Sequence, residues 1–361
     1  GEHRYLHSFP TRRSSDLTNL LKEKELEKFI KEAIEATKYL SEDEFRYLPE
    51  EELYYKGGAE DLRTIDPDII KIDSKTKIDL ARQIENEVFG TDERIVSVTS
   101  TYMDEVSHMI LADSNGFRGE SDNSYTGLVA EVSVKGDTGR PSDYWVEYNI
   151  FYDKLVKTGI GKKALERTLR KLNPKKIGSG KYNLIVDNMV AATLLSPFIS
   201  ALFGSSLYQK NSFLDGKINT KVASDKLSFI DDPLIISGLS SRHFDNEGLK
   251  AIKRTVVEQG VLRNYFINTY YGRKLDLPPT SGSISNIIFQ NGTLDQKGLV
   301  KSVNKAILVT GFNGGNCNGA TGDFSYGIAG FLVQNGEIIH PVSEMNITGN
   351  MNDFWNTLAA V

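Results

Sequence analysis

The residues of this sequence that could do chemistry are its histidines, one cysteine and a pair of neighbouring carboxylates. A zinc peptidase holds its metal with two imidazoles on one helical face and needs a carboxylate to act on the metal-bound water. The only histidines at helical spacing are His3 and His7, whereas His108, His243 and His340 are far apart. The sequence therefore predicts no zinc site made of consecutive residues, although a site assembled from the three distant histidines and acidic residues stays open.

Cys317 is the single cysteine of the chain, which excludes an internal disulfide and favours a reducing cytoplasm. A thiol nucleophile needs a base or a positive local field to become a thiolate at neutral pH. The neighbours Asn316 and Asn318 are uncharged. We therefore interpret Cys317 as a small residue in a tight loop.

Asp245 and Glu247 are two residues apart, directly before Gly248. Paired carboxylates can do acid–base work, but only within about 5–10 Å of a scissile bond. Apolar residues flank the pair, beginning with Phe244. This pattern favours a turn between strands, in which the carboxylates cap backbone N–H groups or pair with Arg254.

A segment rich in glycine and asparagine, residues 311–322, follows the strand-like apolar run 306–309. The composition predicts that the strand ends there and that a loop brings bare backbone N–H groups against a ligand or partner. The loop lacks the Gly-Lys-Ser/Thr ending of a phosphate-binding P-loop, so a hairpin or a substrate-cleft loop is favoured. After it, Asn335-Gly336 between the apolar runs 331–333 and 338–339 predicts a β-hairpin with a primed turn.

Two blocks of the sequence resemble the TldD/TldE (PmbA) metallopeptidase family. The first, Ile307–Met351, contains TGDFSYGIAGF, NGEI and PVSEMNITGNM. The second, Ser240–Lys274, resembles the family's run of Phe-Asp-x-Glu-Gly, a basic pair, a Gly-hydrophobic-Leu turn and a Tyr/Ser-x-Arg-Lys ending. The similarity spans most of residues 41–361 and is greater to the TldE/PmbA branch than to the zinc-bearing TldD branch. Compared with full-length members, the chain is expected to lack a first α/β segment and a short C-terminal strand region.

The resemblance also implies where a zinc motif would lie. In the TldD branch, His-Glu-x-x-x-His lies on a helix soon after a strand that corresponds to residues 182–186. The corresponding helix here, residues 191–203, contains no His, Asp, Glu or Cys. The implied chain is a non-catalytic subunit with no metal ligand and no cofactor of its own. Its implied partners are a TldD-like zinc peptidase subunit and the unfolded peptides that the pair degrades or trims in the cytoplasm.

The family motifs imply peptide-binding or interface residues and no catalytic residue. They are Phe244, Asp245, Glu247, Gly248, Arg254, Tyr271, Arg273, Asn313, Gly315, Gly322 and Asp323. Two alternatives from other classes stay open. One is a stand-alone peptide-binding or scaffold protein without a proteolytic partner, and the other is a peptidase with an unconventional site that involves Cys317.

Composition excludes several other classes. The chain has 361 residues, 39% of them hydrophobic and 25% charged, which is typical of a globular protein long enough for two domains. The net charge of −5 makes non-specific nucleic-acid binding a poor expectation, since such binding depends on neutralising phosphates. No run of about 18 apolar residues is present, so no membrane-spanning helix is expected.

The predicted fold class is α+β, in two domains joined by a turn-forming linker at residues 173–180. Residues 18–172 are expected to form a mixed helix/sheet domain of the family's central type. Residues 181–361 are expected to form the larger C-terminal domain, mainly antiparallel β with a buried helix at 189–203. The first domain is expected to contain helices at 19–40, 74–89 with Ser74 as N-cap, and 163–172, with strands between 94 and 152.

The N-terminus has a different interpretation. Residues 6–17, LHSFPTRRSSDL, match one reading frame of a common sequencing-library adapter. We interpret residues 1–17 as an artefact of sequence assembly and exclude them from the fold; the alternative is a natural basic tail.

Overall fold

The structure is a computed structural model that describes residues 17–39 and 41–361. The chain divides into two compact units between Tyr47 and Leu48. The first unit contains helix α1 (Glu23–Thr37), which confirms the amphipathic helix expected there, although none of its residues is buried. Apart from Leu17, the adapter-like segment lies outside the described residues. No helix in the described part of the chain is long and apolar enough to cross a bilayer.

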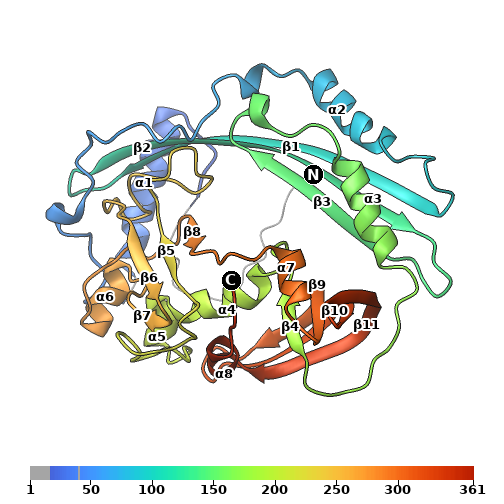
Figure 1. Cartoon of the computed structure of the whole chain (residues 1–361). Helices are drawn as coiled ribbons and strands as arrows, with labels where there is room; N and C mark the ends of the chain where they lie inside the picture. Colours follow the sequence, from blue (N-terminus) through green and yellow to red (C-terminus); the bar gives the residue numbers. More distant parts are fainter. Residues whose placement is uncertain (1–16, 40) are drawn as a thin grey trace. The chain divides into compact units, whose positions relative to one another are not determined.

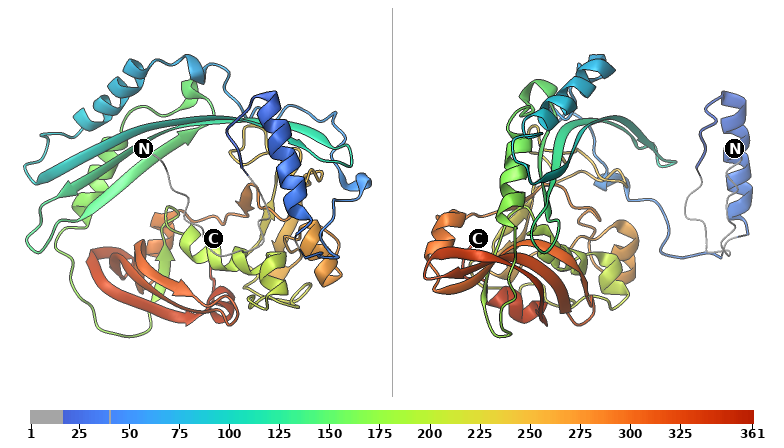
Figure 2. Two further views of the ribbon diagram at one scale, coloured as in Figure 1. Left: turned by 180° about the vertical axis from the view of Figure 1, so that it is seen from behind. Right: turned by 90° about the vertical axis from the view of Figure 1, so that its right-hand side faces the viewer.

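The second unit opens with a three-stranded antiparallel sheet in the order β1-β2-β3 (Figure 1). Its strands are β1 (Ile95–Ala112), β2 (Arg118–Val134) and β3 (Ser142–Asn149). Two helices, α2 (Ser74–Asn86) and α3 (Ile160–Arg170), lie on the same face of this sheet (Figure 2). They pack against alternate residues of β2, because successive side chains of a strand point to opposite faces. The fully buried residues of β2 in this core are Leu128, Ala130, Val132 and Val134.

The start of α2 corrects a local prediction. Asp73, not Ser74, is the N-cap, and its Oδ1 accepts the N–H of Thr76 at 2.9 Å. Both residue types cap helices well, so sequence alone could not choose between two neighbours.

β1 and β2 continue past the end of β3 as a two-stranded ribbon (Figure 1). β3 pairs with β2 only from Thr126 to Ser133, whereas β1 stays paired with β2 as far as Ala112 and Arg118. The ribbon ends in the hairpin turn expected at Asn115-Gly116, where Gly116 has a φ of 89°. We call this end, residues 111–119, the ribbon tip.

A second sheet has the strand order β11-β10-β9-β4. β4 runs parallel to β9, and the other pairs are antiparallel. The predicted hairpin is confirmed, with a φ of 50° at Asn335 and 79° at Gly336. The strands are β4 (Asn183–Val186), β9 (Lys305–Cys317), β10 (Asp323–Gln334) and β11 (Glu337–Asn350).

The loop expected after residue 309 is a wrong prediction. β9 continues to Cys317 and pairs with β10 through Phe312–Ile328, Gly315–Tyr326 and Cys317–Phe324, with two register shifts. The facing residues of β10 are buried and apolar, and this tertiary pairing overrides the turn preference of glycine and asparagine. Only residues 318–322 form the turn.

The rest of the second unit surrounds a large aromatic core. Helix α4 (Ala192–Ala201) is the buried helix that the sequence predicts, and Phe198 at its centre is completely buried against Phe229 and Trp355. Together with the mainly antiparallel sheets, it confirms the α+β class. The remaining strands form a small sheet: β5 (Phe229–Asp231), β6 (Arg254–Glu258), β7 (Val261–Leu262) and β8 (Ile287–Phe289). The remaining helices are α5 (Gly204–Tyr208), α6 (Thr269–Leu275), α7 (Gln296–Lys301) and α8 (Met351–Asn356), with single 3₁₀ turns at Glu51–Leu53, Ile69–Lys71 and Tyr152–Lys154.

Candidate functional site

A cavity of about 390 Å³ lies beside the start of α4. Its walls come from three parts of the fold: the first sheet with α3, the segment that leads into α4, and the middle of β9. They are formed by Glu131, Ser142, Asp143, Tyr144 and Lys171, by Met189, Val190 and Thr193, and by Thr310, Gly311 and Phe312. We call this cavity the α4–β9 cavity.

Strand pairing explains why a cavity opens at this point. β4 accompanies β9 only as far as the pair Val186–Val309, and Asp187 then closes the pairing with a 2.9 Å hydrogen bond from its N–H to the Val309 carbonyl. The chain leaves the sheet there and turns into α4. From Thr310 to Cys317, β9 has β10 on one side and none of the described strands on the other. This part of β9, residues 310–317, is an open strand edge, and its residues 313–316 are exposed.

The polar groups of the cavity divide into satisfied and unsatisfied ones. Asp143 is 6% exposed and forms ion pairs with Lys171 at 3.0 Å and Arg167 at 3.2 Å. Arg167 also reaches Asp187 at 3.4 Å. In contrast, the Oγ1 of Thr310, a residue that is 8% exposed, has no hydrogen-bond partner among the described residues. A buried hydroxyl without a partner is unfavourable, so this group is suited to meet a ligand or water.

The side chains near this cavity do not fit a zinc ion. Helix α4 contains only apolar, proline, serine and threonine side chains. Within residues 17–39 and 41–361 no group of three or more His, Cys, Asp or Glu side chains could hold a metal. The three distant histidines have separate neighbours: His108 contacts Asp122, His243 stacks on Tyr55, and His340 lies 3.0 Å from the Pro341 carbonyl.

Cys317 lies half-buried at the end of β9. Burial raises the pKa of its thiol, and the negative charge of Asp323 raises it further. Both effects favour the neutral thiol, which is a poor nucleophile. The geometry therefore disfavours a cysteine peptidase.

The family motif around Phe244 contacts the ribbon tip. The Phe244 and Phe117 rings pack edge to face with centroids 5.4 Å apart, and Tyr54 stacks on Phe117 at 5.0 Å. A Cβ on Gly248, whose φ is 80°, would lie 2.7 Å from the Phe117 ring, and one on Gly119 would lie 2.7 Å from Phe244. Phe244 and Gly248 thus join the C-terminal part of the chain to the end of the ribbon.

The two carboxylates of this motif accept hydrogen bonds from backbone N–H groups, as expected if they cap the backbone. Asp245, 2% exposed, accepts the N–H groups of Glu247 at 2.9 Å and Leu249 at 3.1 Å on its Oδ1. Glu247 accepts the N–H and the hydroxyl of Thr269, the first residue of α6, at 2.9 and 2.6 Å. Neither carboxylate forms the ion pair with Arg254 that was the other option.

Arg254 instead pairs with Asp231, which is completely buried. Its Nε donates to Oδ2 of Asp231 at 3.1 Å, while Oδ1 accepts from the N–H and hydroxyl of Ser285 at 2.6 Å each. Burial lowers the pKa of the Arg254 guanidinium, and Asp231 opposes this shift. These contacts indicate a structural role for Arg254, as the buried partner of Asp231.

The other predicted site residues lie on separate elements. On α6, the Tyr271 ring lies 6.0 Å from that of Tyr208, and Arg273 donates to the Leu48 carbonyl at 2.8 Å. Asp323 holds the turn at residues 318–322 by accepting hydrogen bonds from Asn350 and Thr321, which lower its pKa. Buried Gly322 belongs to the same turn and has a φ of 82°.

Only Asn313 and Gly315 of the predicted residues belong to the open edge of β9 beside the α4–β9 cavity. Gly315 has a φ of 111°, and a Cβ there would lie 2.1 Å from the Ser325 carbonyl oxygen, so the close approach of β10 requires glycine. Sequence reasoning missed Thr310, Asp143 and Lys171. No local signal identifies them, because their proximity depends on where β4 leaves the sheet.

Comparisons with known proteins agree with this architecture. The model of the PmbA/TldA metallopeptidase central domain matches residues 67–172, and that of the PmbA/TldA metallopeptidase C-terminal domain matches residues 179–361. The metalloprotease PmbA homolog of Haemophilus influenzae is 30% identical over 95% of this chain and 77% of its own length. Metalloprotease PmbA of Escherichia coli O157:H7 is also 30% identical, over 92% of this chain and 74% of its own length.

Solved structures give the same result. A proposed modulator of DNA gyrase from Bacteroides thetaiotaomicron is 48% identical and superimposes with a TM-score of 0.93, over 95% of this chain and 79% of that one. TldE from Thermococcus kodakarensis, at 19% identity, shares the fold with a TM-score of 0.81, over 94% of this chain and 79% of that one. The chain therefore belongs to the PmbA/TldD family of metallopeptidases.

Proposed function

We propose that this chain is the non-catalytic subunit of a heteromeric, zinc-dependent peptidase of the cytoplasm that degrades or trims unfolded peptides. The observation that carries the proposal is the composition of α4. Where a peptidase of this family would need ligands for a water-activating metal, α4 offers only apolar and hydroxyl side chains. The zinc would then be supplied by a TldD-like partner subunit.

The open edge of β9 is our candidate for the peptide-binding surface. An extended peptide can add to an exposed strand edge through main-chain hydrogen bonds, which read no particular sequence. Residues 313–316 are Asn-Gly-Gly-Asn, so no bulky side chain keeps the incoming backbone away. The adjoining α4–β9 cavity is large enough to take a side chain, and the Thr310 hydroxyl is free to donate or accept.

Most strands of a folded protein are already paired on both sides, and edge strands are usually protected, so a folded protein rarely offers an extended segment to such an edge without first unfolding. Peptide capture in this form would therefore restrict a sequence-tolerant peptidase to flexible chains. The stand-alone binding or scaffold function stays the second candidate, because the same open edge would serve it equally well.

The test is to co-express the full chain with a TldD-like subunit and to measure complex formation, zinc content and hydrolysis of an unfolded peptide. We expect a stable complex that contains zinc and hydrolyses the peptide, whereas this chain alone binds the peptide but neither holds stoichiometric zinc nor cleaves. Stoichiometric zinc and chelator-sensitive hydrolysis by the isolated chain would contradict the proposal. Peptide binding with no complex and no assisted turnover would favour the scaffold function.

One variant tests the binding surface separately. Thr310→Val keeps the side-chain volume and removes a hydroxyl that lacks a partner, so folding should be unaffected while peptide affinity falls about tenfold, or about 1.4 kcal/mol. The matched control is Thr255→Val, at an exposed position of β6. Equal peptide affinity of wild type and the Thr310 variant would remove the cavity from the peptide site and leave the subunit role intact.

A further inference from the structure

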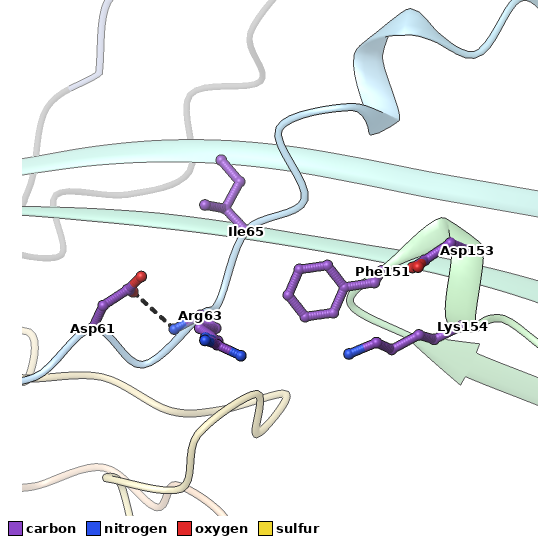
Figure 3. Close-up of a pocket in the computed structure, with 6 residues that line it drawn as sticks. All are labelled: Asp61, Arg63, Ile65, Phe151, Asp153 and Lys154. Atoms are coloured by element: carbon purple, nitrogen blue, oxygen red, sulfur yellow. Dashed lines mark hydrogen bonds between the residues drawn. The ribbon is translucent and has the colours of Figure 1, made fainter.

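A second cavity, of about 360 Å³, lies in a different part of the fold (Figure 3). One wall is the loop of residues 61–65, and the other is the turn of residues 151–154 that follows β3. The cavity is lined by Asp61, Arg63, Ile65, Phe151, Asp153 and Lys154. None of these residues belongs to the α4–β9 cavity or to the family motifs, so the following inference does not depend on the proposed function.

The two walls are fixed to each other and to the sheet. Asp66, 7% exposed, accepts the N–H of Tyr152 at 2.9 Å on Oδ2 and that of Asp68 at 2.9 Å on Oδ1. The Thr64 hydroxyl donates to the Asp122 carbonyl of β2 at 2.6 Å. The cavity is therefore preformed, which lowers the entropic cost of binding a ligand.

Arg63 adopts an unusual backbone conformation in this loop. Its φ is 51°, in the left-handed region, which is unfavourable for a residue with a Cβ. The conformation is held by a 2.9 Å hydrogen bond from the Arg63 N–H to Oδ1 of Asp61. Strain of this kind is concentrated at functional sites, where it fixes the direction of a side chain.

Two cationic side chains, Arg63 and Lys154, come from opposite walls of the cavity. The side chains of Arg63 and Lys154 point toward one another across the cavity, below the ring of Phe151 (Figure 3). The Lys154 Nζ lies 4.8 Å from the centre of that ring. Within the described chain neither Arg63 nor Lys154 forms an ion pair, and an anion between them would relieve the repulsion of two like charges.

The other lining residues restrict the kind of anion. A guanidinium binds a carboxylate through two parallel hydrogen bonds, and a lysine adds a point charge. Phe151 and Ile65 present apolar surface next to the cations, which suits an apolar side chain. Asp61 and Asp153 in the same lining would repel a highly charged anion such as a phosphate ester.

We infer that this cavity binds a single carboxylate attached to an apolar side chain, as in the C-terminal residue of a peptide or in a free N-acylated amino acid. Arg63 and Lys154 bind the carboxylate, and Phe151 and Ile65 contact the side chain. The two sources present the same chemical group, and the length of the ligand distinguishes them.

The test is calorimetric titration of the full chain with N-acetyl-L-phenylalanine and, as a neutral match, with N-acetyl-L-phenylalaninamide. We expect saturable binding of the acid, at least tenfold weaker binding of the amide, and loss of affinity as salt screens the charges. A hexapeptide that ends in phenylalanine should bind more tightly than the acid if peptide C-termini are the ligand, and no more tightly if free acylated amino acids are.

Two variants keep the inference falsifiable. Arg63→Gly should reduce affinity at least fivefold while preserving or raising the melting temperature, because glycine adopts this φ without strain. Lys154→Gln should reduce affinity similarly, whereas Lys162→Gln, at an exposed position of α3, should leave it unchanged. Equal binding of acid and amide, no saturable binding of either, or wild-type affinity in the Arg63 variant would each overturn the inference.

Discussion

Cys317 illustrates how an environment decides the role of a residue. Its pairing partner on β10 is Phe324, and Asp323 directly precedes Phe324 in the chain. The thiol therefore lies between buried apolar surface and a negative charge. A catalytic thiolate requires the opposite surroundings, with a nearby cation or a base. The sequence pointed to a structural role from the uncharged neighbours, and the structure supplies a physical reason.

This reasoning predicts the reactivity of the thiol. Because the pKa of Cys317 is raised, the alkylation rate of the native protein should increase only at a higher pH than that of N-acetylcysteine. Asp323→Asn should move the profile to lower pH, since it removes the negative charge that disfavours the thiolate. Iodoacetamide labelling followed by mass spectrometry measures both profiles; half-maximal labelling near neutral pH would contradict the prediction.

At the scale of the elements, the contact between the ribbon tip and the Phe244 motif has the clearest steric requirements. Burial and a hydrogen bond to Asp113 raise the pKa of Tyr54 to about 12, so its hydroxyl stays protonated and donates to Asp113 at 2.5 Å. Tyr54 and Phe244 both pack against Phe117 in one hydrophobic cluster. The ribbon extends beyond the support of β3, so its far end depends on contacts with other segments, of which this is one and the hydrogen bond from Asn115 to the Pro49 carbonyl is another.

Gly119 tests that contact. Gly119→Ala would place a methyl group 2.7 Å from the Phe244 ring and 2.8 Å from that of Phe117, and we expect it to reduce the free energy of unfolding by about 1–3 kcal/mol. The matched control is Gly139→Ala, where an added Cβ meets no atom within 4 Å. That variant should be neutral or stabilising by up to about 1 kcal/mol. Urea unfolding measures the stability of both variants. If Gly119→Ala is as stable as Gly139→Ala, the ribbon tip does not pack tightly against Phe244.

On the scale of the whole second unit, one arginine joins the first sheet to the segment between β4 and α4. Arg167 of α3 reaches Asp143 on β3 and Asp187 after β4, and Asp187 also accepts from Gln296 at 3.3 Å. The side chains of both carboxylates are less than one-tenth exposed. Buried ion pairs of this kind add little over apolar packing, but losing one partner leaves a charge without compensation.

Arg167→Met should therefore destabilise the protein by about 3 kcal/mol, the low end of the usual range because Lys171 still pairs with Asp143. Arg82→Met is the control: its pair with Asp79 is exposed and 3.9 Å long, so the loss should be below about 1 kcal/mol. Calorimetric unfolding measures both. If the Arg167 variant loses no more stability than the control, the connection between the first sheet and the segment after β4 does not depend on the charge of Arg167.

Features that depend on residues close together in the chain could be predicted from the sequence, whereas features that depend on distant residues could not. Asn335-Gly336 specifies its own turn, because the positive φ values that these residues tolerate are what a tight hairpin needs. The N-cap of α2 was predicted one residue too late, at Ser74 and not at Asp73, because both residue types cap helices well and the two are neighbours. The second half of β9 was predicted as a loop because it is rich in glycine and asparagine. Pairing with β10 holds this segment as a strand.

The amino-acid sequence alone determined the family, the α+β class and the absence of metal-binding side chains from the helix after β4, because each depends only on residue types at short spacing. The tertiary structure alone decided that β4 leaves the sheet at Val186, which opens the β9 edge and brings Thr310 next to Asp143 and Lys171. It also placed Arg63 opposite Lys154. Contacts between residues so distant in the chain depend on strand register and helix packing, which no local pattern encodes.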